Sequence, residues 1–262
     1  MSLPTDRLDD LRLALELADA ADALTLERFR AEDLHVETKP DLTPVTEADR
    51  DVETAIRDRL AAERPEDAAL GEEYGESAPA PRRWIIDPID GTKNYVRGIP
   101  VWATLLALEE EGELTVGVVS APALHRRWWA AAGGGAFAVD GIGTGPRRLS
   151  VSGVHELSDA QLCVSGLDGW EDAFDTLLEL QRACWRTRGF GDFWGYMLVA
   201  EGAADMCCEA IVSLWDLAAP QVIVEQAGGR FTDRSGARTA AGGDALATNG
   251  LLHDDALAIV GR

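Results

Sequence analysis

The stretch between residues 84 and 94 places an apolar run directly before two carboxylates that lie three residues apart. Residues 85–86 are both isoleucine, so the run predicts a short buried strand. Pro88 has no N–H to donate to a ladder, and we expect the strand to end there. Asp87 and Asp90 are therefore expected where a strand leaves its sheet. In open α/β sheets this edge is where ligands bind.

Two interpretations of these carboxylates are open. If Asp87 and Asp90 are held close together, their carboxylates repel each other unless a cation or a shared proton lies between them. The alternative is an ordinary turn, because aspartate readily hydrogen-bonds nearby backbone groups. The stretch alone does not choose between a cation site and a turn, so other acids along the chain have to decide.

The composition limits the classes of partner. The chain has 262 residues and 46% hydrophobic side chains, which is typical of a globular protein with a large core. It carries 24 basic and 46 acidic residues, a net charge of −22. With no excess of cationic side chains to meet phosphates, we expect no binding to nucleic acid or anionic membranes. The excess acid suits a protein that handles cations, and it also favours solubility.

Several features favour the cytoplasm. The N-terminus lacks the basic and apolar regions of a signal peptide, and no apolar run approaches the ~18 residues of a membrane span. The four cysteines have no CxxC spacing and lie in apolar surroundings, so we expect buried thiols and no disulfide framework.

Hydrophobic periodicity predicts an α/β protein of two lobes. We place a lobe with the metal-binding motifs at 1–145, a glycine-rich boundary at 141–146, and a second lobe at 146–262 that completes the site. The expected helices are 6–30, one that starts at 46–49 and ends before Pro65, and 171–183, 192–201, 215–227 and one from about 251. The expected strands form hairpins at 103–108 with 114–120 and at 127–129 with 136–138, followed by 161–165, 184–188, 204–209 and 229–232; residues 35–46 are expected to be a loop.

Further acids point to a metal site. They are Asp49 on a first helical turn, the pair Glu72–Glu73 in a loop, Glu209 at a strand end, and Asp216 at a helix start. Each alone is explained as a helix cap or a solvated charge. Together they supply the oxygen ligands that Mg²⁺ prefers, whereas the four histidines lack zinc spacing.

A phosphate site is expected beside the acids. Thr92 and Lys93 follow Asp90 at a turn whose backbone N–H groups can bind an anion. Carboxylates next to an anion cradle are what metal-assisted phosphoester hydrolysis requires.

These residues resemble a known family. Gly71-Glu72-Glu73, the stretch 84–92, Trp215-Asp216-Leu217-Ala218-Ala219 and the stretch 225–229 are similar to motifs of the inositol monophosphatase-like phosphatases, which are Mg²⁺-dependent and lithium-sensitive. The resemblance covers nearly the whole chain, in order. It implies a layered α/β/α/β/α sandwich, a homodimer, a small phosphate monoester as substrate, and roughly two or three Mg²⁺ ions per site.

The resemblance also implies roles for individual residues. The metal ligands fall on Glu72, Asp87, the backbone carbonyl of Ile89, Asp90 and Asp216, with Glu73 as an outlying or weak-site acid. Thr92 with Asp49 would orient or activate the attacking water. Glu72 is the third residue expected to be catalytic. The amides of Gly91 and Thr92 would bind the phosphate, with Asp90 and Asp216 also touching the substrate.

Within the family, the stretches 38–46, 94–102, 120–124, 191–193 and 247–253 are most similar to the actinobacterial histidinol-phosphatases. This resemblance implies hydrolysis of L-histidinol phosphate, a step of histidine biosynthesis. The alternatives are an inositol-phosphate or sugar-phosphate phosphatase and a non-catalytic acidic scaffold that binds cations.

One departure from the broad family bears on the substrate. The family usually has Gly-Ser where this chain has Gly191-Asp192. Asp192, with Glu209 across the pocket and Arg188 nearby, would suit a leaving group that carries an ammonium and an imidazole. The alternative role of Asp192 is an N-cap for the helix from Phe193.

Overall fold

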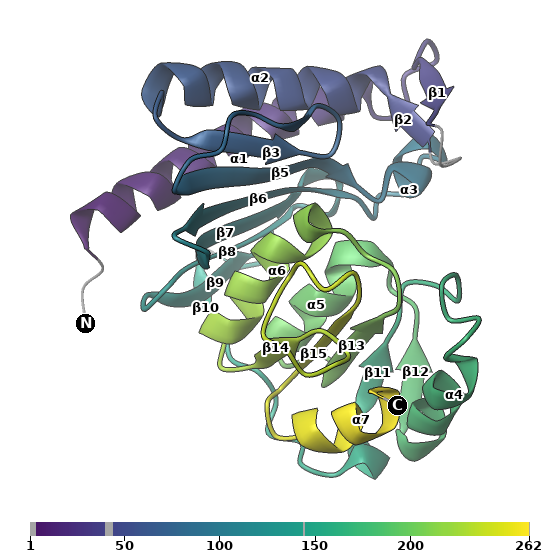
Figure 1. Cartoon of the computed structure of the whole chain (residues 1–262). Helices are drawn as coiled ribbons and strands as arrows, with labels where there is room; N and C mark the ends of the chain where they lie inside the picture. Colours follow the sequence, from purple (N-terminus) through teal and green to yellow (C-terminus); the bar gives the residue numbers. More distant parts are fainter. Residues whose placement is uncertain (1–3, 40–43, 144, 262) are drawn as a thin grey trace.

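The computed structural model describes residues 4–39, 44–143 and 145–261 (Figure 1). The helices are α1 (Thr5–Arg28), α2 (Glu47–Glu63), α3 (Thr92–Val96), α4 (Phe174–Ala183), α5 (Asp192–Ala200), α6 (Leu214–Gln226) and α7 (His253–Val260). The strands of the first sheet are β3 (Ala68–Gly71), β4 (Gly75–Glu76), β5 (Arg82–Asp90), β6 (Ala103–Glu110), β7 (Glu113–Ala121), β8 (Arg126–Ala131), β9 (Gly135–Val139) and β10 (Arg147–Arg148). Those of the second are β11 (Gln161–Cys163), β12 (Arg186–Arg188), β13 (Met206–Glu209), β14 (Arg230–Thr232) and β15 (Ala245–Thr248).

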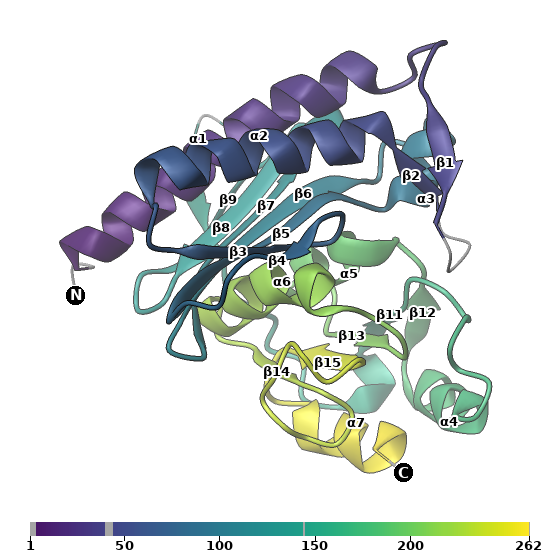
Figure 2. The same ribbon diagram turned by 45° about the horizontal axis from the view of Figure 1, so that its top comes forward.

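The elements form the five layers implied by the resemblance. Figures 1 and 2 show α1 and α2 on the outer face of the first sheet, α5 and α6 between the two sheets, and α4 and α7 on the far face of the second sheet. One apolar cluster lies between α1, α2 and the first sheet, one continuous cluster surrounds α5 and α6 and contacts both sheets, and a third lies between the second sheet and the pair α4 and α7. The predicted α/β/α/β/α sandwich is therefore confirmed.

The first sheet has the strand order β10-β9-β8-β7-β6-β5-β3-β4. Both predicted hairpins are present, as β6 with β7 and β8 with β9. Because β10 at residues 147–148 pairs with β9, this sheet extends past the boundary that the glycine-rich segment 141–146 predicts.

The second sheet has the order β12-β11-β13-β15-β14. β11 runs parallel to β12 and β13, whereas β15 is antiparallel to both β13 and β14. The sequence did not predict β15, which is a short alanine-containing segment with weak strand propensity. Its insertion places β13, which carries Glu209, near the middle of the sheet.

The expectation that the strand would stop at Pro88 is wrong. β5 continues to Asp90, and its pairing with β6 shifts between Asp87 and Asp90. Pro88 lies within this irregular stretch, where its missing N–H costs no ladder bond, and its carbonyl accepts a 2.8 Å bond from the Thr104 hydroxyl. In a regular strand, residues three apart point to opposite faces, so the irregularity is what lets both carboxylates reach one site.

The expected loop at 35–46 is also partly wrong. It contains a two-stranded ladder, β1 (Val36–Thr38) with β2 (Pro44–Thr46), and residues 40–43 lie outside the described chain. Within the described residues, no helix is both long and apolar enough to cross a membrane.

Candidate active site

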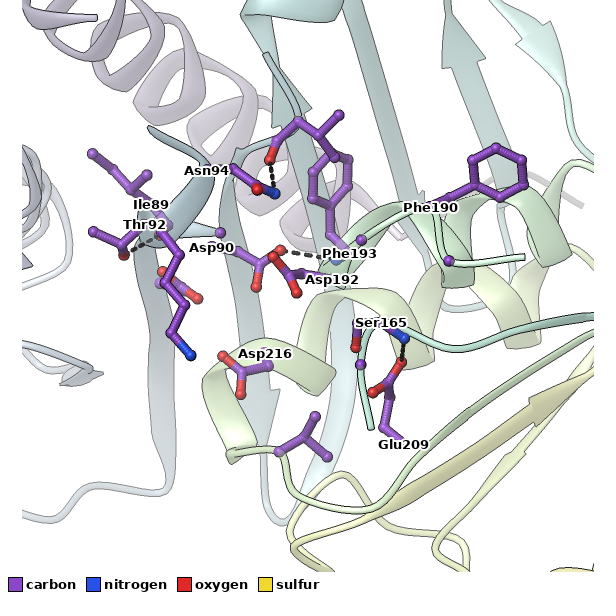
Figure 3. A pocket seen from close by; sticks show the side chains of 18 of the residues that line it. Ile89, Asp90, Thr92, Asn94, Ser165, Phe190, Asp192, Phe193, Glu209 and Asp216 are labelled. Atoms are coloured by element: carbon purple, nitrogen blue, oxygen red, sulfur yellow. Dashed lines mark hydrogen bonds between the residues drawn. The ribbon is translucent and has the colours of Figure 1, made fainter. Parts of the chain in front are cut away.

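A cavity of about 770 Å³ opens where the end of β5 meets the first turns of α5 and α6 (Figure 3). Both lobes line it. The predicted site residues along its wall are Glu72, Asp87, Ile89, Asp90, Gly91, Thr92, Asp192, Glu209 and Asp216. Segments far apart in the sequence thus meet at one place, which favours a binding site over an isolated turn.

Three carboxylates form the centre of the cavity wall. One oxygen from each of Asp87, Asp90 and Asp216 lies within 4.8 Å of the other two. Asp90 accepts a 2.8 Å bond from the amide of Phe193, and Asp216 accepts a 2.7 Å bond from the amide of Ser213. These bonds fix two of the three side chains against the starts of α5 and α6.

The third carboxylate is incompletely paired. Oδ1 of Asp87 is buried and has no hydrogen-bond partner among the described residues. Burial, and then the charges of neighbouring acids, raise the pKa of Asp87 and of Asp90 well above the ordinary value, and burial raises the pKa of Asp216 to about 6. A divalent cation relieves this repulsion and uses oxygen ligands, so the residues fit Mg²⁺.

The loop acids lie to one side of this cluster. Glu72 lines the cavity, and its Oε1 lies 2.7 Å from Nζ of Lys39. The same ammonium lies 2.5 Å from Oε1 of Glu73, which is not among the cavity-lining residues and whose pKa is raised by burial. Lys39 therefore bridges the two glutamates.

Thr92 connects the cavity to a buried aspartate. Its hydroxyl lies 2.9 Å from the carbonyl oxygen of Ile89 and 3.3 Å from Oδ1 of Asp49. Asp49 is fully buried at the start of α2, where it forms a capping box with Thr46. Burial raises the pKa of Asp49 to about 6.

Gly91 is required by the turn before α3. Its φ of 83° is left-handed, and a Cβ there would lie 3.0 Å from both Oδ2 of Asp192 and the carbonyl oxygen of Val101. The backbone at Gly91 and Thr92 can therefore approach a ligand closely, as an anion cradle requires.

The far side of the cavity carries more acid. Asp192 is the first residue of α5, and the N-cap residue is Gly191, which has no side chain to cap the helix. The Phe193 amide at the start of α5 instead donates to Asp90. The N-cap interpretation of Asp192 is therefore wrong, and its carboxylate lines the cavity, where burial raises its pKa.

Glu209 forms the opposite side of this acidic half. It accepts a 2.7 Å bond from the Ser165 amide, and burial raises its pKa to about 7 (Figure 3). Asp192 and Glu209 are thus two acids that the metal cluster does not use.

Arg188 is not brought into the cavity. It lies on the edge strand β12, is exposed, and its guanidinium donates a 2.7 Å bond to the carbonyl of Thr187. Arg188 is not among the residues that line the cavity, so its contact with the substrate stays a prediction.

The sequence also missed several lining residues: Asn94, Ser165, Asp168, Phe190 and Tyr196. Asn94, which lies in α3, donates a 2.9 Å bond to the carbonyl of Val101 and so fixes the segment after α3 against this helix. The Asp168-Gly169 dipeptide is a turn signal just after the predicted strand at 161–165, and it could have indicated a loop at the strand's carboxyl end.

Comparisons with known proteins agree with this geometry. The sequence profile of the Inositol monophosphatase family matches residues 7–261. This chain belongs to the inositol monophosphatase family. The match covers nearly the whole chain and includes every residue of the site described above.

Named relatives include two bacterial histidinol-phosphatases. The chain is 57% identical to that of Streptomyces coelicolor over 258 residues, covering 96% of this chain and 97% of the relative. It is 58% identical to that of Mycobacterium tuberculosis over 253 residues, covering 95% and 96%. Among solved structures, the IMPase of Thermotoga maritima superposes with a TM-score of 0.85 at 32% identity, with 96% of each chain covered.

Proposed function

We propose that this chain is a Mg²⁺-dependent phosphomonoesterase that hydrolyses L-histidinol phosphate to L-histidinol and phosphate. The observation that carries the proposal is identity of 57–58% over nearly the full length to histidinol-phosphatases. The cavity supports it, because one wall has a carboxylate cluster that fits Mg²⁺ and the other has two further acids.

The metal would be held by Asp87, Asp90, Asp216, Glu72 and the carbonyl of Ile89, with Glu73 outside this set. When bound, roughly two or three Mg²⁺ ions supply Lewis acidity to the phosphoryl group and its leaving oxygen. The carboxylates would hold the ions, and the Gly91–Thr92 amides would bind the phosphate oxygens.

The nucleophilic water would be oriented by Thr92 and Asp49. Oδ1 of Asp49 faces the Thr92 hydroxyl, while its Oδ2 is occupied by Thr46. With a pKa of about 6, the Asp49 carboxylate is ionised at neutral pH and can take a proton that passes through Thr92.

The leaving group would be recognised by Asp192 and Glu209. Histidinol carries an ammonium and an imidazole, and carboxylates in a partly buried site bind such cations by charge-assisted hydrogen bonds. Inositol phosphate presents only neutral hydroxyls beside its phosphate; these can donate hydrogen bonds to the two acids but lack the added attraction between opposite charges.

The test is phosphate release from three substrates by the purified chain with excess MgCl₂. We expect kcat/KM for L-histidinol phosphate to exceed those for inositol 1-phosphate and fructose 1,6-bisphosphate by at least about 10-fold, the value of one charged hydrogen bond. A preference for either of the other esters would overturn the substrate assignment, and absence of phosphate release from all three would overturn the activity.

We further propose a cytoplasmic homodimer that lithium inhibits. Light scattering of the purified chain tests the dimer, cell fractionation tests the compartment, and addition of LiCl to the phosphate-release assay tests the inhibition. A monomer, a membrane or secreted pool, or full activity in LiCl would contradict the corresponding part.

A further inference from the structure

Three charged side chains follow one another along α2 at a spacing of four residues. This spacing places Asp49, Glu53 and Arg57 on the same face of the helix. Asp49 contacts Thr92 at the cavity. Glu53 and Arg57 instead meet the turn between β3 and β4, which carries Glu72.

The Glu53 carboxylate accepts hydrogen bonds from this turn. Its side chain is fully buried. Oε2 accepts a 2.8 Å bond from the amide of Glu73, and Oε1 lies 3.3 Å from the amide of Tyr74. Nε of Arg57 donates a 2.7 Å bond to the same Oε1. A buried carboxylate is stable as an anion when it is paired and hydrogen-bonded in this way.

Arg57 extends the contact to both ends of the turn. Its guanidinium donates to the carbonyl of Gly75 and lies 3.5 Å from the carbonyl oxygen of Ala69. On the opposite side, the amide of Glu72 donates a 3.2 Å bond to the carbonyl of Ile86 in β5. The turn is therefore fixed between α2 and the strand that carries Asp87 and Asp90.

The packing at Gly71 shows how closely the turn lies on Glu53. A Cβ at Gly71 would lie 2.0 Å from Oε1 of Glu53 and 2.2 Å from its Cδ. No larger residue fits there unless the carboxylate moves. The glycine before Glu72 is thus explained by the buried acid behind it.

We propose that Glu53 is a positioning residue for the metal site: its carboxylate fixes the turn from Gly71 to Gly75 and thereby holds Glu72 in the cavity wall. The inference rests on the proposed function, since it takes Glu72 as a Mg²⁺ ligand. Glu53 is not among the cavity-lining residues, so it acts through the turn and touches neither substrate nor metal. Residues that support ligands in this way typically change metal affinity about 10- to 100-fold when replaced.

The test compares two substitutions on the same helix. Glu53→Gln replaces one of the two carboxylate oxygens by an NH₂ donor, so the bond from the Glu73 amide to Oε2 and the bonds from Tyr74 and Arg57 to Oε1 cannot all persist. Glu63→Gln is the matched control: Oε1 of Glu63 also lies 2.7 Å from an arginine Nε, that of Arg59, but the pair is exposed at the end of α2. Each variant is treated with EDTA and titrated calorimetrically with MgCl₂ in the absence of substrate.

We expect Glu53→Gln to raise the Kd for Mg²⁺ by about 10-fold or more and Glu63→Gln to leave it unchanged. Phosphate release by Glu53→Gln should need correspondingly more MgCl₂, while kcat at saturating MgCl₂ stays within a few-fold of the wild type. Glu53→Asp keeps the charge but shortens the side chain, and it should give an intermediate Kd.

Glu72→Gln separates failure of this inference from failure of the proposed function. If the wild type binds no Mg²⁺, or if Glu72→Gln leaves its Kd unchanged, the metal assignment itself is wrong. If Glu72→Gln weakens binding but folded Glu53→Gln binds like the wild type, the positioning role is overturned and the proposed function stands. Should Glu53→Gln not fold, Glu53→Asp decides, and wild-type affinity in that variant overturns the role.

Discussion

The Thr92 hydroxyl lies 3.3 Å from Oδ1 of Asp49, although the two residues belong to different helices. The other oxygen of Asp49 is held by the amide and hydroxyl of Thr46, at 2.8 and 2.6 Å. One carboxylate oxygen is therefore committed to the helix cap, and the other faces the cavity through Thr92.

This pairing predicts that Asp49→Asn lowers kcat by about 100-fold or more, because general-base contributions are of this size. Since the pKa of Asp49 is about 6, wild-type activity should fall as pH drops below about 6, where the carboxylate is protonated. Kinetics across pH check both statements. The exposed Asp51 on the same helix supplies the control Asp51→Asn, which should behave like the wild type.

The carboxylate cluster predicts that Asp87→Asn changes the Tm in opposite directions without and with Mg²⁺. Burial and nearby acids raise the pKa of Asp87, so without metal its contribution to stability is lost as pH rises through the raised pKa. At pH 8 in EDTA, Asp87→Asn should raise the Tm by roughly 3 °C or more, equivalent to about 1 kcal/mol. When EDTA is replaced by excess MgCl₂, the Tm of the wild type should rise above that of Asp87→Asn, whose own Tm should not rise. A lower Tm for the variant in EDTA would contradict the repulsion.

Asp192 predicts a substrate-specific effect. Asp192→Asn should raise KM for L-histidinol phosphate by about 10- to 100-fold, since hydrogen bonds to charged groups contribute about 1.5–3 kcal/mol. KM for inositol 1-phosphate, which lacks a cation, should change little. Steady-state kinetics on both esters decide the matter, and equal changes would remove Asp192 from leaving-group recognition.

His253 predicts a pH dependence of stability unrelated to the active site. It is fully buried between the hydroxyls of Thr248 and Thr232, each 3.0 Å from a ring nitrogen, and burial lowers its pKa to about 4. The Thr232 hydroxyl donates to the carbonyl of Asp233, so the neutral ring with a proton on Nε2 fits the site.

Because the unfolded histidine has a pKa near 6.5, the unfolded state binds more protons between about pH 6.5 and 4. This contribution to the free energy of unfolding is fully present above about pH 6.5 and falls by up to about 3 kcal/mol toward pH 4. Urea unfolding should show a flatter pH dependence for His253→Gln in this range. Substitution of the exposed His35 by Gln should preserve the wild-type slope.

Local signals were enough to predict much of the chain. The capping pattern from Thr46 to Asp49 marks the start of α2, and turn residues mark both hairpins of the first sheet. The motifs around Asp90 and Asp216 also led to residues that meet in one cavity.

The errors arise where partners distant in sequence decide the structure. β5 passes Pro88 because β6 accommodates a shift in pairing, and nothing between residues 84 and 94 encodes that partner. β15 has little strand propensity and forms between β13 and β14. From the sequence, Glu53 is indistinguishable from the exposed charges of α2. Its role depends on the turn after β3, whose Glu73 amide donates to it.

The division of the cavity between two sheets has an evolutionary consequence. Asp87 and Asp90 come from the first sheet, whereas Glu209 belongs to the second and Asp192 to a helix packed on it. Substitutions on the second sheet can therefore exchange one alcohol for another without disturbing the residues that handle phosphate. A laboratory selection for new esters should collect its first mutations around Asp168, Asp192 and Glu209, and leave the end of β5 untouched.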